Sequence, residues 1–196
     1  MQSATTFHPV QDCEEGVVNT VSGQLINLRN PSPKTITIAD IANSLSKICR
    51  FGGHTNAFYS VAQHCVLVAA MCEHFDIGAH YGKEGLLHDA SEAYLGDVIK
   101  PLKIILGETY NALEREFEAI IDKKFALRTD RETMAAIKHF DIVALHLEHL
   151  AFQQNKPAKL IENLEKFNLL IEDQFAWNCK TANAMFLAAY SDYFEL

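Results

Sequence analysis

Residues 86–97 read LLHDASEAYLGD and place four titratable side chains, His88, Asp89, Glu92 and Asp97, among apolar neighbours. If residues 81–95 form one helix, His88 and Glu92 lie one turn apart on the same face, with Asp89 beside them. Apolar side chains at positions 86, 87, 90, 93 and 95 would hold this helix against a core. Because burying ionisable groups costs free energy unless they are bound to something, the stretch predicts a binding or catalytic site. The alternative is a capped surface helix with ordinary acidic residues.

Length and composition are those of a globular protein. The chain has 196 residues, of which 48% are hydrophobic, and this is enough for one compact domain with a sizeable core. No apolar run approaches the roughly 18 residues that a membrane span needs, so we expect no membrane association. Residues 1–15 are polar and acidic, which predicts a loosely held N-terminal arm rather than a signal peptide, and residues 16–196 are predicted to form a single domain.

Charge and cysteine content indicate which partners and which cellular compartment to expect. The formal net charge is −8 and no block of basic residues stands out, so we expect no polynucleotide partner. A small phosphorylated substrate is still possible. An acidic site would repel its phosphate, however, so the site would need a bound cation to reverse the negative electrostatic potential. The five cysteines are odd in number and never spaced as Cys-x-x-Cys, which indicates reduced thiols and a cytoplasmic protein, in the host cytoplasm if a phage encodes it.

The apolar spacing predicts an all-α protein, a helical bundle with one small β-hairpin at its N-terminal end. Alternation around Ser22-Gly23 predicts the hairpin over residues 16–28. Capping signals at Thr37, Ser60 and Thr129 mark the starts of three helices. The predicted helices cover residues 37–50, 61–75, 81–95, 109–125, 131–155, 157–171 and 178–194.

Two further polar residues lie inside apolar helical runs. His64 is on the first turns of the helix predicted for residues 61–75, and Asp141 lies within IKHFDIVAL, residues 137–145. A carboxylate in such surroundings is seldom left ionised and unpaired. With His88 and Asp89, these residues form a mixed nitrogen and oxygen set suited to Zn²⁺, Mn²⁺, Fe²⁺ or Co²⁺, with Mg²⁺ as a further possibility.

At this point the chain resembles the HD-domain family of metal-dependent phosphohydrolases. The ordered pattern is His64, then His88-Asp89, then Asp141, and the resemblance covers roughly residues 38–150. The segments SVAQH (60–64) and HDASE…GD…PLK (88–103) are similar to the bacterial 5′-deoxynucleotidases and to the compact phage dATP triphosphohydrolases. Arg50, fourteen positions before His64, matches an arginine that contacts substrate in those enzymes. Phe51 stands where that family usually has tryptophan, a departure that bears on base selectivity.

The resemblance implies a role for each of these residues. His64, His88, Asp89 and Asp141 would bind one divalent ion per subunit. Glu92 would orient or deprotonate the attacking water, or protonate the leaving group, and Asp97 would assist it. The resemblance and the charge pattern together suggest four substrate contacts: Arg50, Phe51, Lys100 and Lys103. Because residues 90–138 contain no histidine, we expect a site with one metal ion rather than two.

The expected activity is hydrolysis of a 2′-deoxynucleotide, with the whole triphosphate removed from a purine deoxynucleoside triphosphate such as dATP. The 52 positions between Asp89 and Asp141 are few, as in the compact triphosphohydrolases. The alternatives are a 5′-deoxynucleotidase acting on monophosphates, with the same residues in the same roles, and a regulatory module that senses nucleotides without catalysis. The family also implies a homo-oligomer, for which the C-terminal helix (178–194) is a candidate contact.

Overall fold

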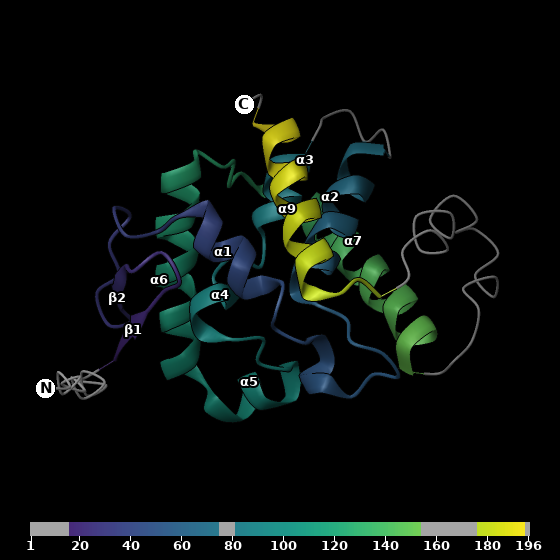
Figure 1. The fold of residues 1–196 in the computed structure, drawn as a ribbon, viewed down its shortest axis with the longest axis horizontal. Coiled ribbons are helices and arrows are strands. Elements are labelled where there is room, and N and C mark those ends of the chain that lie inside the picture. The colour runs from purple at the N-terminus through teal and green to yellow at the C-terminus, as the bar shows by residue number, and fades with distance from the viewer. Residues whose placement is uncertain (1–15, 75–80, 154–175, 195–196) are drawn as a thin grey trace, which may run out of the picture.

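The computed structural model describes residues 16–74, 81–153 and 176–194 and is mostly helical, with one small antiparallel hairpin (Figure 1). This confirms the predicted fold class. The two strands pair with Val18 opposite Ile26. The elements, in chain order, are β1 (Val17–Asn19), β2 (Leu25–Asn27), α1 (Ile38–Leu45), the 3₁₀ turn η1 (Arg50–Gly53), α2 (Val61–His74), α3 (Gly82–Leu87), α4 (Glu92–Leu95), α5 (Lys100–Leu106), α6 (Glu108–Phe125), α7 (Arg131–Glu148), the π-helical turn η2 (His149–Gln153) and α9 (Cys179–Tyr193).

Helix α2 is the centre of the bundle. It contacts α1, α3, α7 and α9, and Figure 1 shows α9 lying across it. A helix that is apolar on every side is stable only when it is surrounded. The fully or almost fully buried apolar residues of α2 are Val61, Ala62, Cys65, Leu67, Val68, Ala69, Met71 and Cys72. His64 is therefore carried by the most enclosed element of the described structure.

A glycine allows α3 to approach α2 closely. A Cβ atom at Gly85 would lie 3.0 Å from the Cα of Ala69 and 3.1 Å from the Sγ of Cys72. Any larger residue would push α3 away from α2. This contact matters for the site because α3 ends immediately before His88.

The start of α1 anchors the hairpin to the bundle. The backbone N–H of Asp40 donates to Thr37 Oγ1 over 3.1 Å, which confirms the predicted cap. The Asp40 carboxylate in turn accepts hydrogen bonds from the hydroxyls of Thr20, Ser22 and Thr37. These bonds join the turn between β1 and β2 to the first turn of α1.

The prediction of one helix over residues 81–95 is wrong. Helix α3 ends at Leu87, and α4 begins only at Glu92. Between them the chain tightens, because the backbone N–H of residues 90, 92 and 93 each donates to the carbonyl three residues earlier. His88 and Glu92 therefore do not share one continuous helix, although the turn keeps both on the inner side of the structure.

Other boundaries differ in smaller ways. None of the predicted helices covers α5; Pro101 lies in its first turn, where proline is well tolerated. Asp130, rather than Thr129, caps α7 by accepting from two backbone N–H groups. Helix α7 ends at Glu148 and continues as η2. The helix predicted for 157–171 lies outside the described residues.

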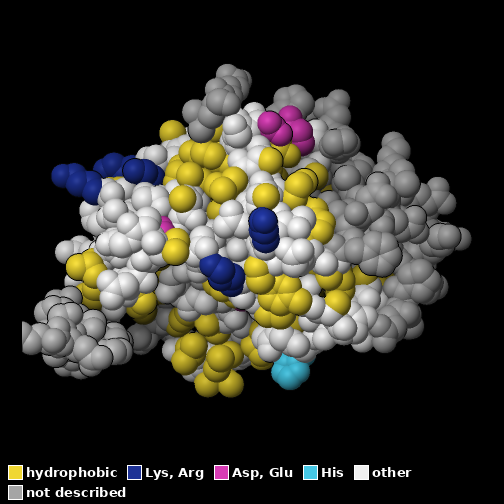
Figure 2. Space-filling model, in the orientation of Figure 1, with side chains coloured by type: hydrophobic (Ala, Val, Ile, Leu, Met, Phe, Trp, Pro, Cys, Tyr) yellow, Lys and Arg dark blue, Asp and Glu magenta, His cyan; other side chains and the backbone are white. Residues whose placement is uncertain are grey.

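Helices α9 and α5 differ in how much of their apolar surface is exposed. Helix α9 turns Ala182 and Phe186, both fully buried, into the core. Helix α9, the candidate subunit contact, thus buries its inner apolar face against the core of its own subunit. Helix α5 instead leaves apolar side chains exposed, and Figure 2 shows hydrophobic atoms gathered at the lower edge, where Figure 1 places α5. These residues are Leu102, Ile104, Ile105 and Leu106. Within the described ranges, none of the helices has the length and apolar character that crossing a bilayer requires.

Candidate metal centre

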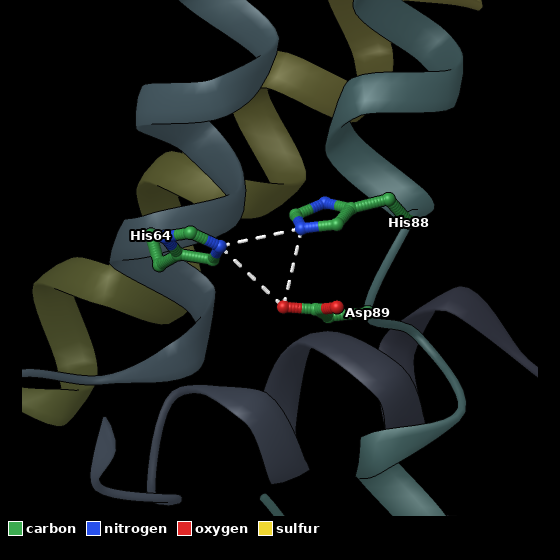
Figure 3. Close-up of side chains that lie close together, drawn as sticks. All are labelled: His64, His88 and Asp89. Carbon is green, nitrogen blue, oxygen red and sulfur yellow. Dashed lines mark hydrogen bonds and ion pairs between the residues drawn. The ribbon is translucent and has the colours of Figure 1, made fainter. Parts of the chain in front are cut away.

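Three of the predicted ligands point toward one another in the interior (Figure 3). His64 comes from the first turn of α2, and His88 and Asp89 come from the tight turn after α3. The Nε2 atoms of the two histidines lie 3.2 Å apart. Asp89 Oδ2 lies 3.5 Å from His64 Nε2 and 3.2 Å from His88 Nε2. These three side chains form a group that could hold a metal ion.

Asp141 reaches the same place from α7. Its Oδ1 lies 3.4 Å from His64 Nε2 and 4.0 Å from His88 Nε2. Its other oxygen, Oδ2, accepts a hydrogen bond of 2.8 Å from the ammonium group of Lys138. The structure thus brings together all four residues that the sequence had marked, from three separated segments of the chain.

The spacing of the donor atoms suits a single cation. Atoms bound to one ion at about 2.0–2.2 Å are about 2.8–3.6 Å apart when they are neighbours in tetrahedral or octahedral coordination. The three distances among His64, His88 and Asp89 are 3.2, 3.2 and 3.5 Å, and Asp141 Oδ1 lies 3.4 Å from His64 Nε2 and 4.0 Å from His88 Nε2. Imidazole nitrogen and carboxylate oxygen are also the donors that divalent transition metals accept. The residues present therefore fit a metal ion.

Both histidines are oriented through their second ring nitrogen. His88 Nδ1–H donates to the carbonyl of Gly85 over 2.8 Å, and His64 Nδ1–H donates to Glu148 Oε1 over 2.6 Å. A histidine that donates through Nδ1 presents Nε2 to a metal. Glu148 is not among the site residues predicted from the sequence. A signal was present, however, because Glu148 lies two helical turns after Asp141 and directly follows Leu147.

The electrostatics of the cluster favour positive charge at its centre. Burial lowers the pKa of His88, but Asp89 outweighs burial and raises that pKa to about 10. For His64, burial and Arg50 act downward, yet the neighbouring carboxylates, Glu148 first, leave its pKa well above the ordinary value. The carboxylates thus favour positive charge in the cluster, which is the kind of charge that a divalent cation would supply.

Glu92 and Asp97 lie beside this cluster with very different pKa values from Asp89. The pKa of Glu92 is raised to about 10 because the carboxyl is buried and faces Asp89 and Asp97. Burial also raises the pKa of Asp97. Glu92 Oε2 is buried without a hydrogen-bond partner among the described residues, while Oε1 lies 3.8 Å from Lys103 Nζ. Glu92 therefore combines a raised pKa with one carboxyl oxygen that is available to a ligand.

The predicted substrate contacts separate into two groups. Arg50 is buried, and its Nη1 lies 3.7 Å from Asp89 Oδ2; the Phe51 ring lies under the same guanidinium, 5.4 Å from its carbon atom. Lys103 is half-buried and donates to Glu114 over 2.5 Å, close to Glu92. Lys100, by contrast, is exposed at the first residue of α5, and no contact within the described segments connects it to the cluster.

The remaining histidines of α7 and η2 take no part in the cluster. His139, His146 and His149 are exposed on the surface. His146 Nδ1–H donates to the carbonyl of Ile142, and His149 contacts Gln153. The carbonyl of His54 accepts a hydrogen bond from the Gln153 side chain, which ties the loop after η1 to η2.

Fold and site together define a mostly helical protein with a buried His-Asp cluster that can hold a metal ion. No family model matches the chain. It is 38% identical over 131 residues to "Uncharacterized protein YfdR" of Escherichia coli K12, across 67% of this chain and 69% of that protein. It is 36% identical over 134 residues to "Uncharacterized protein RCAP_rcc00048" of Rhodobacter capsulatus, across 65% of this chain and 68% of that protein. The chain belongs to the same family as these two proteins.

Proposed function

We propose that the protein is a metal-dependent phosphohydrolase acting on 2′-deoxynucleotides, of the HD-domain type that its motifs resemble. The observation that carries the proposal is the convergence of two imidazole nitrogens and two carboxylate oxygens, with Arg50 and a buried Glu92 beside them. A structural ion-pair cluster would not need an acid left without a partner. Such an acid is typical of a site that transfers protons.

His64, His88, Asp89 and Asp141 would hold one ion, of Zn²⁺, Mn²⁺, Fe²⁺, Co²⁺ or Mg²⁺. When bound, such an ion polarises a phosphoryl oxygen and lowers the pKa of a coordinated water toward about 7. It also offsets the negative charge of the carboxylates, which would otherwise repel a phosphorylated substrate.

The protein's own groups supply binding and proton transfer. The guanidinium of Arg50 presents Nη1 to the cluster, where it can donate to a phosphoryl oxygen. Glu92 carries its proton on a carboxyl whose Oε2 is unpartnered, so it can donate to the oxygen that leaves the phosphorus and later accept a proton from water. Asp97, partly buried beside it, can steady the water or a sugar hydroxyl.

Two versions of the activity differ in the number of phosphates. The short interval between Asp89 and Asp141 favours release of intact triphosphate from a purine deoxynucleoside triphosphate. One observation favours the 5′-deoxynucleotidase version. The cations nearest the cluster, Arg50, Lys103 and Lys138, are each already paired with a carboxylate, and a monophosphate demands fewer of them.

One experiment tests the function and separates the versions. The purified protein is incubated with dNTPs, NTPs and dNMPs in the presence of Zn²⁺, Co²⁺, Mn²⁺ or Mg²⁺, and products are resolved by chromatography. We expect deoxynucleoside with intact triphosphate from dATP. Deoxynucleoside and orthophosphate from dNMP alone would support the monophosphatase version. Nucleotide binding without any product would contradict hydrolysis and indicate a sensing module.

A further inference from the structure

Glu148, the last residue of α7, is a fully buried carboxylate with partners from two other segments. Its Oε1 accepts from the hydroxyl of Tyr59 over 2.9 Å and from His64 Nδ1 over 2.6 Å. Its Oε2 accepts from Arg50 Nε over 3.1 Å and lies 3.0 Å from Arg50 Nη2. Both oxygens are thus fully used, which is the condition under which a buried charge is tolerated.

The bond to His64 decides which ring nitrogen faces the cluster. Because Nδ1–H is donated to Glu148, Nε2 is the nitrogen that approaches His88, Asp89 and Asp141. A carboxylate in this position orients a metal-binding imidazole and makes it a stronger ligand. His64 is fully buried, so water cannot substitute for this partner.

The bonds to Arg50 orient the other half of the site. With Nε and Nη2 engaged by one oxygen of Glu148, the remaining nitrogen, Nη1, is the one that faces Asp89. A guanidinium is planar and rigid, so holding one edge fixes the direction of the other. The phosphate-binding edge of Arg50 and the metal-binding edge of His64 are therefore aligned by the same side chain.

The surroundings hold Glu148 in place. The Tyr59 ring stacks on Phe152 of η2, with centroids 4.3 Å apart. The backbone N–H of Arg50 donates to the carbonyl of Tyr59, and that of Asn56 donates to the carbonyl of Phe152. The loop that carries Arg50 is thereby fastened to the π-helical turn directly after Glu148, and such turns are frequent at functional sites.

We propose that Glu148 is a positioning residue that couples the metal centre to the phosphate-binding arginine. The first part of this proposal, the metal half, is that Glu148 orients His64 for metal binding, and it depends only on the geometry of the cluster. The second part, the arginine half, is that Glu148 orients Arg50 for phosphate binding, and it rests on the proposed function. In Glu148→Gln, whichever way the amide is turned, its NH₂ group meets an N–H donor of His64 or Arg50. We expect this variant to bind Zn²⁺ or Mn²⁺ about 10–100-fold more weakly in calorimetric titrations without nucleotide.

Glu84 provides a matched control. It is equally a buried glutamate paired with an arginine, Arg128; it lies one turn before His88 on α3, but the hydrogen bonds of its carboxylate go to Arg128 and not to the cluster. Glu84→Gln should lower the stability of the fold and leave metal affinity unchanged. A Glu148→Gln variant that bound Zn²⁺ as tightly as the wild type, or no more weakly than Glu84→Gln, would overturn the metal half.

If Glu148→Gln does not fold, the wild type itself provides the test. Long-range ¹H–¹⁵N spectra of the Zn²⁺-loaded protein should show His64 protonated at Nδ1 and bound through Nε2. Coordination through Nδ1 would overturn the assignment. This readout does not depend on hydrolysis, so a protein that cleaved no nucleotide would refute the proposed function and leave this result standing.

The arginine half is tested with inorganic phosphate as the probe, on Zn²⁺-saturated protein. Glu148→Gln and Arg50→Gln should each weaken phosphate binding, and the double variant should be no weaker than Arg50→Gln alone. Additive losses in the double variant would mean that Glu148 does not act through Arg50.

Discussion

His64 Nε2 and His88 Nε2 lie 3.2 Å apart although 24 positions separate the residues in the chain. The contact exists because α3 packs against α2 at Gly85, and because the Nδ1 atoms of both rings are held from behind by Glu148 and by the carbonyl of Gly85. Two imidazoles at this separation, with carboxylates on the same side, are arranged for a shared ligand.

Removing one proposed ligand should remove the metal. We expect Asp141→Asn to bind Zn²⁺ at least about 10-fold more weakly, because a neutral amide oxygen replaces a carboxylate oxygen. The measurement is elemental analysis of purified protein together with the rise in unfolding temperature on adding Zn²⁺. Lys138→Gln is the control, since it removes the exposed partner of Asp141 and leaves the donor atoms in place. Undiminished metal in Asp141→Asn would exclude Asp141 from the site.

Glu92→Gln should separate binding from catalysis. The variant keeps the shape of the side chain but can neither release nor accept the carboxyl proton, so kcat should fall by about 10²–10⁴-fold while metal content is unchanged. Steady-state kinetics on the best substrate of the nucleotide panel provide the measurement, with the exposed Glu116→Gln on α6 as the control. Full activity in Glu92→Gln would show that another group transfers the proton.

Phe51 occupies a left-handed backbone conformation, with φ of 58°, and Ala126 at the end of α6 does the same, with φ of 52°. Such residues cost about 1–2 kcal/mol relative to glycine. Ala126→Gly should therefore raise the free energy of unfolding by up to about 1 kcal/mol without affecting activity.

Phe51→Gly would remove the same backbone strain, but it would also remove the ring beneath the Arg50 guanidinium. We therefore expect the KM for the nucleotide substrate to rise several-fold. An unchanged KM would show that Phe51 has no role in substrate recognition.

The pair of Glu84 and Arg128 should make stability depend on acid pH. Burial alone would raise the pKa of Glu84, but the hydrogen bonds from Arg128 lower it below 4.5. The stabilisation is thus present above pH 4.5 and is lost as the pH falls through the lower pKa of the folded state. Urea unfolding of metal-free wild type and Glu84→Gln should show a difference near neutral pH that shrinks as the pH falls below 4.5. A constant difference would contradict the assignment.

Gly85→Ala should damage the metal site by changing the packing of α3 against α2. The added Cβ would meet the backbone of Ala69 at 3.0 Å, so α3 must shift and carry His88 with it. We expect a loss of about 1–3 kcal/mol in stability together with weaker Zn²⁺ binding. Gly82→Ala is the matched control, because the atoms nearest its Cβ belong to side chains, the Tyr193 ring first, and not to the backbone of α2; it should not lower metal affinity. Equal metal affinity in both variants would contradict a packing role for Gly85 in the site.

Much of the fold could be predicted because its signals are local. The hairpin and the helices α2, α6 and α9 are close to their predicted ranges, since apolar spacing and caps act within a few residues. Helix α1 begins after its predicted cap, Thr37, but ends at Leu45, five residues before the predicted end at residue 50. The helix predicted for residues 81–95 was wrong because local signals could not define its boundaries. A continuous helix over residues 81–95 could not be distinguished from two short helices joined by a tight turn, because the same side chains point inward in both.

What the sequence determined by itself was the identity of the cluster: two histidines and two aspartates in apolar surroundings, with a glutamate three positions after the doublet. Residue type and hydrophobic context are sufficient for this, because buried ionisable groups need partners. Only the tertiary structure decided that Glu148 orients His64 and that Arg50 faces the cluster with one nitrogen rather than with its whole guanidinium. These relations join residues up to 98 positions apart, and no local pattern encodes the packing of α7 and η2 against α2 and the loop of η1.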